Sequence, residues 1–288
     1  MEKIVTLKNL CKKYGKQCVL DVTEVEFAKG KIYGIIGPNG AGKTTMFKLL
    51  AGLIQPTSGD MTFFEGRKTP QEARKKISFM IENPYLDLGM TAAQNMNMLA
   101  ILYDAEPKNV EKLLKLVGLG KTGKKKVKNF SLGMKQRLGI AQALLNDPRI
   151  LILDEPTAGL DPKERVRFRN LISSLAENRI VILSTHIVSD VEYIANEILI
   201  MKNGELIQHG SPEKLLKPIE KCVWECDVSR KEAEELELNY VTANLKHNNG
   251  AERLRIISQE APCRTAWNVD PTLEDLYLYY FAEVSEHE

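Results

Sequence analysis

The chain has 288 residues, of which 27% are charged, and a formal net charge of +2 at pH 7. This length allows one or two domains with a sizeable core, and the balanced charge gives no reason to expect a nucleic-acid partner. The 5 cysteines form no metal-ligand pattern and are expected to be reduced, small apolar side chains. Because the chain shows no signal peptide and no run near the ~20 apolar residues that span a membrane, we expect a soluble protein.

The N-terminal part is predicted to form strands on both sides of a glycine-rich loop. Tyr14 lies in the first turn, where an exposed aromatic ring is available to stack on a base, although a single aromatic side chain more often packs against its neighbours. Apolar runs predict strands at 4–7, 19–27 and 32–36, and two more short strands at 61–66 and 77–81.

The interval 83–148 changes to a helical pattern. A capping box that begins at Thr91 predicts one helix, and Pro107 begins a second. Ser131 is expected to cap a third helix that runs to Asn146. The interval shows no sustained heptad repeat, so we expect packed helices rather than a coiled coil.

Strands and helices alternate after residue 148. Residues 149–155 predict an apolar strand that ends in two carboxylates, Pro162 stands at the start of a helix, and 179–184 predict another buried strand. This alternation is typical of an α/β fold, which the helical interval interrupts.

The pattern changes again beyond residue 218. A strand is expected at 222–228, a capping box at Ser229, a hairpin around 248–250 and a final helix with a stripe of leucine and aromatic residues. We therefore expect two domains, an α/β domain at 1–218 and a small α+β appendage at 219–288.

The strongest functional signal is a loop of the form G-x-x-x-x-G-K-[ST] between a strand and a helix. Its glycines let backbone N–H groups turn toward phosphate oxygens, and the helix directs its positive N-terminal end at the same anion. Lys43 adds a charge for the β- and γ-phosphates, and the Thr44 hydroxyl can ligate Mg²⁺. The sequence predicts a nucleoside triphosphate site formed by Gly37, Pro38, Asn39, Gly40, Ala41, Gly42, Lys43, Thr44 and Thr45.

Two carboxylates at the end of a buried strand are the second signal. Asp154 is expected to hold Mg²⁺, directly or through water, and Glu155 to accept a proton from an attacking water. Buried carboxylates are costly unless they meet a cation, which argues against a purely structural role. His186 directly follows another strand, and alone it would be read as a hydrogen-bonded structural histidine.

Taken together, these motifs resemble those of the nucleotide-binding subunit of an ATP-binding cassette (ABC) transporter. Residues 130–137 resemble the family's signature Leu-Ser-Gly-Gly-Gln, 156–161 its D-loop and His186 its switch histidine. Tyr14 falls where the family has its adenine-stacking aromatic residue. The resemblance covers residues 3–216, with the motifs in the family's order.

The resemblance implies a P-loop NTPase (RecA-like) core with an antiparallel β subdomain and a helical subdomain inserted at about 83–148. Two cassettes would face each other head to tail, with ATP between one phosphate loop and the partner's signature helix. Ser131 and the Gly133 backbone N–H would then reach the γ-phosphate. Glu155 would polarise water, and His186 would contact the γ-phosphate and hold the transition-state geometry, so the chemistry is positioning and charge stabilisation.

The chain departs from the family pattern at two places. Glu82 stands where the family has a glutamine that touches Mg²⁺ and faces the membrane subunit, so the implied metal set is Thr44, Glu82 and Asp154. In the signature, Leu132 and Met134 replace a glycine and a glutamine. The sequence around Glu82 resembles that of bacitracin-resistance and lantibiotic-immunity exporters.

The implied function is ATP hydrolysis, with ATP and Mg²⁺ as cofactors, that powers export of a hydrophobic drug or antimicrobial peptide. The implied partners are a membrane permease and a second cassette, identical or related, at the cytoplasmic face of a bacterial membrane. An importer subunit is the nearest alternative. A translation or repair ATPase is disfavoured because the chain has one cassette and no long coiled coil, and an inactive regulatory subunit because Lys43, Asp154, Glu155 and His186 are present.

Overall fold

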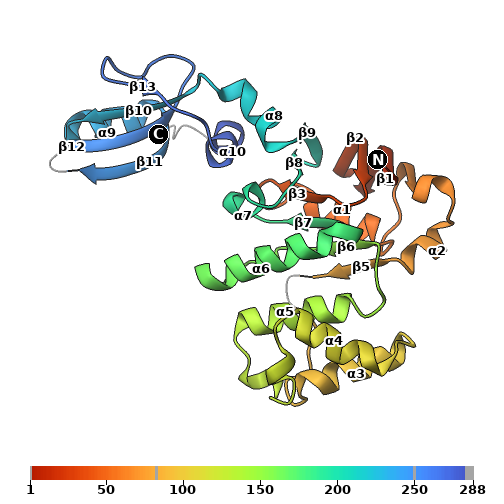
Figure 1. The fold of residues 1–288 in the computed structure, drawn as a ribbon. Helices are drawn as coiled ribbons and strands as arrows, with labels where there is room; N and C mark the ends of the chain where they lie inside the picture. The colour runs from red at the N-terminus through yellow and green to blue at the C-terminus, as the bar shows by residue number, and fades with distance from the viewer. Residues whose placement is uncertain (1, 82–83, 249–250, 283–288) are drawn as a thin grey trace. The chain divides into compact units, whose positions relative to one another are not determined.

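The computed structural model describes residues 2–81, 84–248 and 251–282 (Figure 1). The chain forms two compact units, Met1–Gln208 and His209–Glu288. The boundary expected after residue 218 falls within the second unit, and a division into a catalytic domain and an appendage at that residue stays a prediction.

A mixed β-sheet forms the centre of the first unit. Its nine described strands lie in the order β4-β1-β2-β9-β8-β3-β7-β6-β5. β1, β2 and β4 pair antiparallel on one side, whereas β3 and β5 to β8 pair parallel, as the α/β prediction with an antiparallel subdomain requires. The strands are β1 Lys3–Tyr14, β2 Gln17–Ala28, β3 Ile32–Ile36, β4 Ser58–Phe63, β5 Ile77–Met80, β6 Ile150–Leu153, β7 Ile180–Ser184, β8 Glu197–Lys202 and β9 Glu205–Gly210.

The parallel strands are continuous apolar runs because the sheet is covered on both faces. Every residue of β3, β6 and β7 is buried. These three strands are neighbours in parallel register, so their carboxyl ends meet at one edge of the sheet. The phosphate loop, the Asp154–Glu155 pair and His186 follow these ends, which brings the predicted site together.

Helices α3 to α5 form the inserted helical part, drawn in yellow and green in Figure 1. The capping box at Thr91 is confirmed, and Ser131 caps α5 by accepting a hydrogen bond from the Met134 N–H at 3.3 Å. α5 ends at Ala143, three residues before the expected Asn146, and Asp147 has a left-handed backbone and precedes a proline, so the helix cannot resume there. The helices of the first unit are α1 Lys43–Leu50, α2 Pro70–Arg74, α3 Ala92–Leu102, α4 Pro107–Leu116, α5 Leu132–Ala143, α6 Pro162–Leu175 and α7 Val188–Glu192.

The strand expected at 61–66 is wrong in its bounds. β4 spans Ser58–Phe63, and the next two residues, Phe64 and Glu65, have φ angles of 53° and 56°. A left-handed backbone cannot continue a strand, so the chain turns here.

The second unit is a small α+β fold, as predicted. Its sheet order is β11-β12-β10-β13, and Cys226, Leu254 and Ile256 belong to its core. The predicted hairpin is formed by β11 and β12, and its expected turn at 249–250 lies outside the described residues. The elements are α8 Pro212–Leu216, β10 Val223–Val228, α9 Arg230–Asn239, β11 Val241–Asn248, β12 Ala251–Ile257, β13 Trp267–Asn268 and α10 Leu273–Phe281.

Candidate active site

The loop between β3 and α1 is built around glycines that no other residue could replace without strain. Gly37 has φ 156°, and a Cβ atom placed there would lie 2.2 Å from the Met201 carbonyl oxygen. Gly42, the N-cap of α1, has φ 99°, and its Cβ would lie 2.9 Å from the Val19 carbonyl oxygen. The neighbouring strands therefore hold the loop in a shape that requires glycine at both positions.

A cavity of about 500 Å³ lies beside this loop. Its walls combine the predicted loop with the two predicted carboxylates, so the structure brings the two strongest motifs of the sequence into one site. The lining residues are Gln17, Val19, Asn39, Gly40, Ala41, Gly42, Lys43, Thr44, Thr45, Asp154 and Glu155.

Lys43 lies in the wall of this cavity and is 7% exposed. Its ammonium donates hydrogen bonds to the carbonyl oxygens of Gly37 at 2.7 Å and Pro38 at 3.0 Å. Burial lowers the pKa of Lys43, and the nearby carboxylates of Glu155 and Asp154 oppose that effect. The loop thus holds a buried cation beside backbone N–H donors, which suits binding of a phosphate group.

Asp154 is fixed by hydroxyl groups on both of its carboxylate oxygens. Thr44 Oγ1 donates to Oδ2 at 2.8 Å, and Ser184 Oγ donates to Oδ1 at 2.6 Å. Thr44 and Asp154 both lie in the cavity wall, and their side-chain oxygens are of the kind that Mg²⁺ prefers as ligands. No cage of three or more His, Cys, Asp or Glu side chains occurs among the described residues, but Mg²⁺ needs none, since it usually combines one or two carboxylates with water and substrate phosphates.

Glu155 is held in a strained backbone conformation next to His186. Its φ angle is 48°, and its backbone N–H donates to Ser184 Oγ at 3.0 Å. One side-chain oxygen, Oε2, accepts a hydrogen bond from the His186 backbone N–H at 3.2 Å and lies 2.7 Å from His186 Nδ1. The carboxylate thus has a fixed position at the cavity wall, as a general base needs.

Five of the predicted nucleotide contacts do not line this cavity. Two of them, Gly37 and Pro38, belong to the loop itself, where their carbonyl oxygens accept hydrogen bonds from Lys43. The other three lie elsewhere. Tyr14 is 54% exposed at the end of β1, and the Lys12 ammonium lies 5.1 Å from its ring centroid. Ser131 and Gly133 lie at the start of α5, and a Cβ on Gly133 would lie 2.6 Å from Glu164 Oε2, which is held by α6. The contacts of Ser131 and Gly133 with ATP were predicted across a dimer of two cassettes, and they stay a prediction.

Two of the predicted metal ligands, Thr44 and Asp154, are joined by a hydrogen bond, whereas the third, Glu82, lies outside the described residues. The sequence reading missed two contributors to the site, Gln17 in the cavity wall and Ser184 beneath the carboxylates. Gln17 could have been suspected, because it follows directly on the turn that carries Tyr14.

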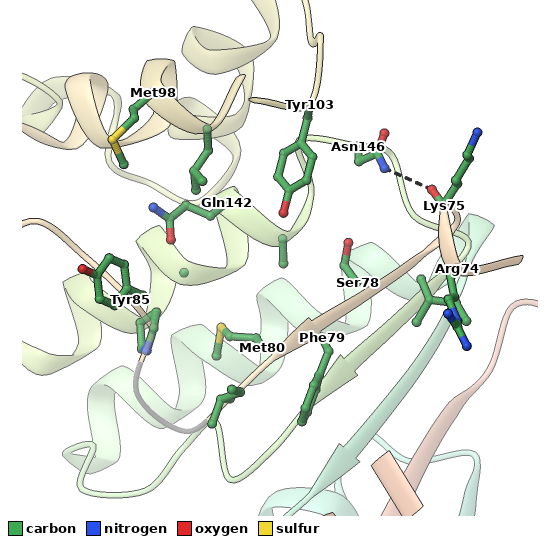
Figure 2. Close-up of a pocket in the computed structure, with 16 residues that line it drawn as sticks. Arg74, Lys75, Ser78, Phe79, Met80, Tyr85, Met98, Tyr103, Gln142 and Asn146 are labelled. Carbon is green, nitrogen blue, oxygen red and sulfur yellow. Dashed lines mark hydrogen bonds between the residues drawn. The ribbon is translucent and has the colours of Figure 1, made fainter. Parts of the chain in front are cut away.

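A second cavity, of about 710 Å³, lies between β5 and helices α3 and α5 (Figure 2). Met98 and Tyr103 reach it from α3, and Met80 from β5. Several large apolar side chains in and around this part of the chain are exposed: Ile81, Tyr85, Met98, Ile101, Leu102 and Tyr103. We call these six exposed side chains the apolar surface, and a gathering of exposed apolar side chains often marks a site of contact with another protein.

Comparison with known proteins identifies the family. The ABC transporter family matches residues 20–158. The lantibiotic transport ATP-binding protein SrtF of Streptococcus pyogenes is 43% identical over 205 residues, which cover 71% of this chain and 89% of SrtF. The chain belongs to the ABC transporter family. It is an ATP-binding subunit of a transporter and an ATPase.

Other ABC proteins match more of the chain. The bacitracin transport ATP-binding protein BcrA of Enterococcus faecalis is 37% identical over 266 residues, which cover 90% of this chain and 86% of BcrA. The solved structure of cbiO1 from Clostridium perfringens, part of the ABC transporter complex cbiONQ, superposes with a TM-score of 0.69 at 26% identity and covers 83% of this chain and 96% of cbiO1. Among the described residues, no helix combines the length and apolar character of a membrane span.

Proposed function

We propose that this ATPase powers export of an antimicrobial peptide or a hydrophobic drug through a separate permease, at the cytoplasmic face of a bacterial membrane. The observation that carries the proposal is the match to BcrA over 266 residues. Since the first unit ends at Gln208, a match of this length must include much of the second unit as well. Similarity to a protein named for bacitracin transport therefore extends beyond the part common to ABC ATPases.

Hydrolysis is assigned to the residues of the first cavity. The phosphate loop, 37–45, binds the phosphates of ATP, with Lys43 at the β- and γ-phosphates. Glu155 accepts the proton of the attacking water, and His186 holds that carboxylate in place through the contacts at 2.7 and 3.2 Å. Bound Mg²⁺ would neutralise developing phosphate charge, and Thr44, Asp154 and Glu82 are the residues assigned to hold it. Glu82 remains a prediction from the sequence.

The site is completed by a second cassette, either a copy of this chain or a related one. Ser131 and the Gly133 N–H from that partner are assigned to the γ-phosphate. Their position on α5, away from the cavity lining of their own chain, supports a contact made across a dimer. ATP would then bind between the two cassettes and link them.

Contact with the permease is assigned to the apolar surface. The cavity there is lined by Phe79, Met80 and Met98 together with polar groups such as Gln142, a combination that suits an amphipathic segment of a membrane protein (Figure 2). Ile101 is 81% exposed and Leu102 is 73% exposed. Burial of such side chains by a partner is favourable, by about 25 cal/mol per Å² of apolar surface.

The test is to express the chain with its genomically neighbouring permease in a sensitive bacterium and to measure growth in bacitracin and in a lantibiotic. We expect protection that is lost in Glu155→Gln. Ile101→Asp with Leu102→Asp should remove protection and co-purification of the permease while basal ATPase activity remains. Leu238→Asp, a change at a 54% exposed leucine of the second unit, is the matched control. Substrate uptake in place of resistance would refute export.

A further inference from the structure

Ser184 is a fully buried hydroxyl residue at the end of β7, with an exposed fraction of 0%. A buried hydroxyl must find hydrogen-bond partners, and both partners of this one belong to the active site. Its oxygen donates to Asp154 Oδ1 at 2.6 Å and accepts from the Glu155 N–H at 3.0 Å. One oxygen atom therefore links the carboxylate assigned to the metal with the backbone of the residue assigned as general base.

The first bond fixes the rotation of the Asp154 carboxylate. Because Ser184 occupies Oδ1, the other oxygen, Oδ2, is the one turned to Thr44, at 2.8 Å. Without the serine hydroxyl the carboxylate could rotate and offer either oxygen to Thr44. The bond from β7 thus selects the orientation in which Asp154 and Thr44 present oxygens together.

The second bond fixes the backbone of Glu155. A φ angle of 48° is unfavourable for a residue with a side chain, and it persists only where the surroundings hold it. The bond from the Glu155 N–H to Ser184 Oγ is such a restraint. This backbone geometry in turn directs the Glu155 side chain to His186, with Oε2 2.7 Å from Nδ1.

We propose that Ser184 is a positioning residue for ATP hydrolysis, whose single hydroxyl sets the relative placement of the Asp154 and Glu155 carboxylates. It touches no substrate and acts through these two residues. The proposal rests on the ATPase activity alone and is independent of whether the transporter exports or imports. Since misplacement of catalytic groups by about 1 Å can reduce a rate about 100-fold, loss of this hydroxyl should affect turnover more than binding.

The experiment compares Ser184→Ala with the wild type in the purified full-length chain. We expect kcat to fall about tenfold or more at saturating Mg²⁺ and ATP, with KM changed less than about threefold. Calorimetry with a non-hydrolysable ATP analogue should show unchanged affinity in EDTA and a smaller gain in affinity on addition of Mg²⁺. A kcat within twofold of the wild type, or an equal loss of affinity with and without Mg²⁺, would overturn the proposal.

Two further variants test whether the effect of Ser184→Ala comes from the lost hydrogen bonds, from the changed side-chain shape or from lower stability. Ser184→Cys fills the same space with a much weaker hydrogen-bonding group, so its kcat should stay as low as that of Ser184→Ala. Wild-type turnover in Ser184→Cys would mean that shape, not the hydroxyl, matters, and would overturn the proposal. Ser229→Ala removes another serine hydroxyl that accepts a backbone N–H, as the cap of α9, and should lower stability without changing kcat.

Discussion

The contact between Glu155 and His186 predicts that the two residues act as a unit in hydrolysis. Glu155→Gln keeps the shape of the side chain but removes the proton acceptor, so kcat should fall by about 10²–10⁴, or about 3–5 kcal/mol of transition-state stabilisation, while ATP affinity is retained. His186→Ala removes a hydrogen bond of about 2 kcal/mol at most. Because the histidine side chain is 58% exposed and solvent weakens the bond, we expect a loss of about tenfold.

The decisive measurement is the double variant. If His186 acts through the carboxylate at 2.7 Å, its removal matters little once the carboxylate is gone, so Glu155→Gln with His186→Ala should turn over about as fast as Glu155→Gln alone. Single-turnover ATPase assays on the three variants measure the coupling energy between Glu155 and His186 in the hydrolysis step. If the fold losses of the two single variants multiply in the double variant, Glu155 and His186 act independently and the reasoning is refuted. His247→Ala is the matched control, because His247 lies against Glu252 in the second unit and should leave kcat unchanged.

Two predictions concern the nucleotide site itself. Lys43→Ala should weaken ATP binding in calorimetry at fixed Mg²⁺, because it removes the buried ammonium bonded to the Gly37 and Pro38 carbonyls; unchanged affinity would mean that this loop does not bind the phosphates. Glu82→Gln should keep much of the ATPase activity, whereas Glu82→Ala should lose more of the resistance than of basal hydrolysis. Intact resistance in Glu82→Ala would rule out a coupling role for Glu82.

Motifs that consist of neighbouring residues in the sequence could be predicted from the sequence. The phosphate loop, the Asp154–Glu155 pair and the capping boxes at Thr91 and Ser229 each depend on a few adjacent residues, and the structure has them as expected. Ser184 was not predicted as a member of the site, because its role depends on a bond to Asp154, 30 residues away along the chain. A short-range pattern cannot specify such a pairing.

The order of the strands in the sheet could not be predicted from the sequence either. β8 contains the run Ile198–Met201, which has the character of a buried strand, yet nothing local places it between β3 and β9. β1 also extends well past the run at 4–7, because pairing with β2 continues to Tyr14. Pairing decides both outcomes, across a tight turn for β1 and between distant segments for β8, since strand propensity depends on the neighbours a strand acquires.

The pH dependence of the second unit is expected to depend on Asp275, which is 1% exposed. Burial by itself would raise the pKa of this carboxyl, but hydrogen bonds from Arg255 and Thr272 outweigh it and hold the pKa below its usual value. A lowered folded-state pKa contributes stability that is present above the unfolded pKa of about 4 and is lost as the pH falls through the folded value. The unit should therefore lose stability in acid below about pH 4.

Asp275→Asn tests this expectation. Removing one partner of a buried pair costs about 3–5 kcal/mol, and we expect about 2–4 here because Arg255 keeps its contacts to Glu225 at 3.1 Å and the Asp270 carbonyl at 2.7 Å. Hydrogen exchange of β12 and α10 amides between pH 3 and 7 measures the difference, which should shrink toward pH 3. Asp227→Asn breaks an exposed bidentate pair with Arg253 and should change little. If Asp275→Asn differs from the wild type equally at pH 3 and pH 7, the ionised carboxylate is not the source of the stability.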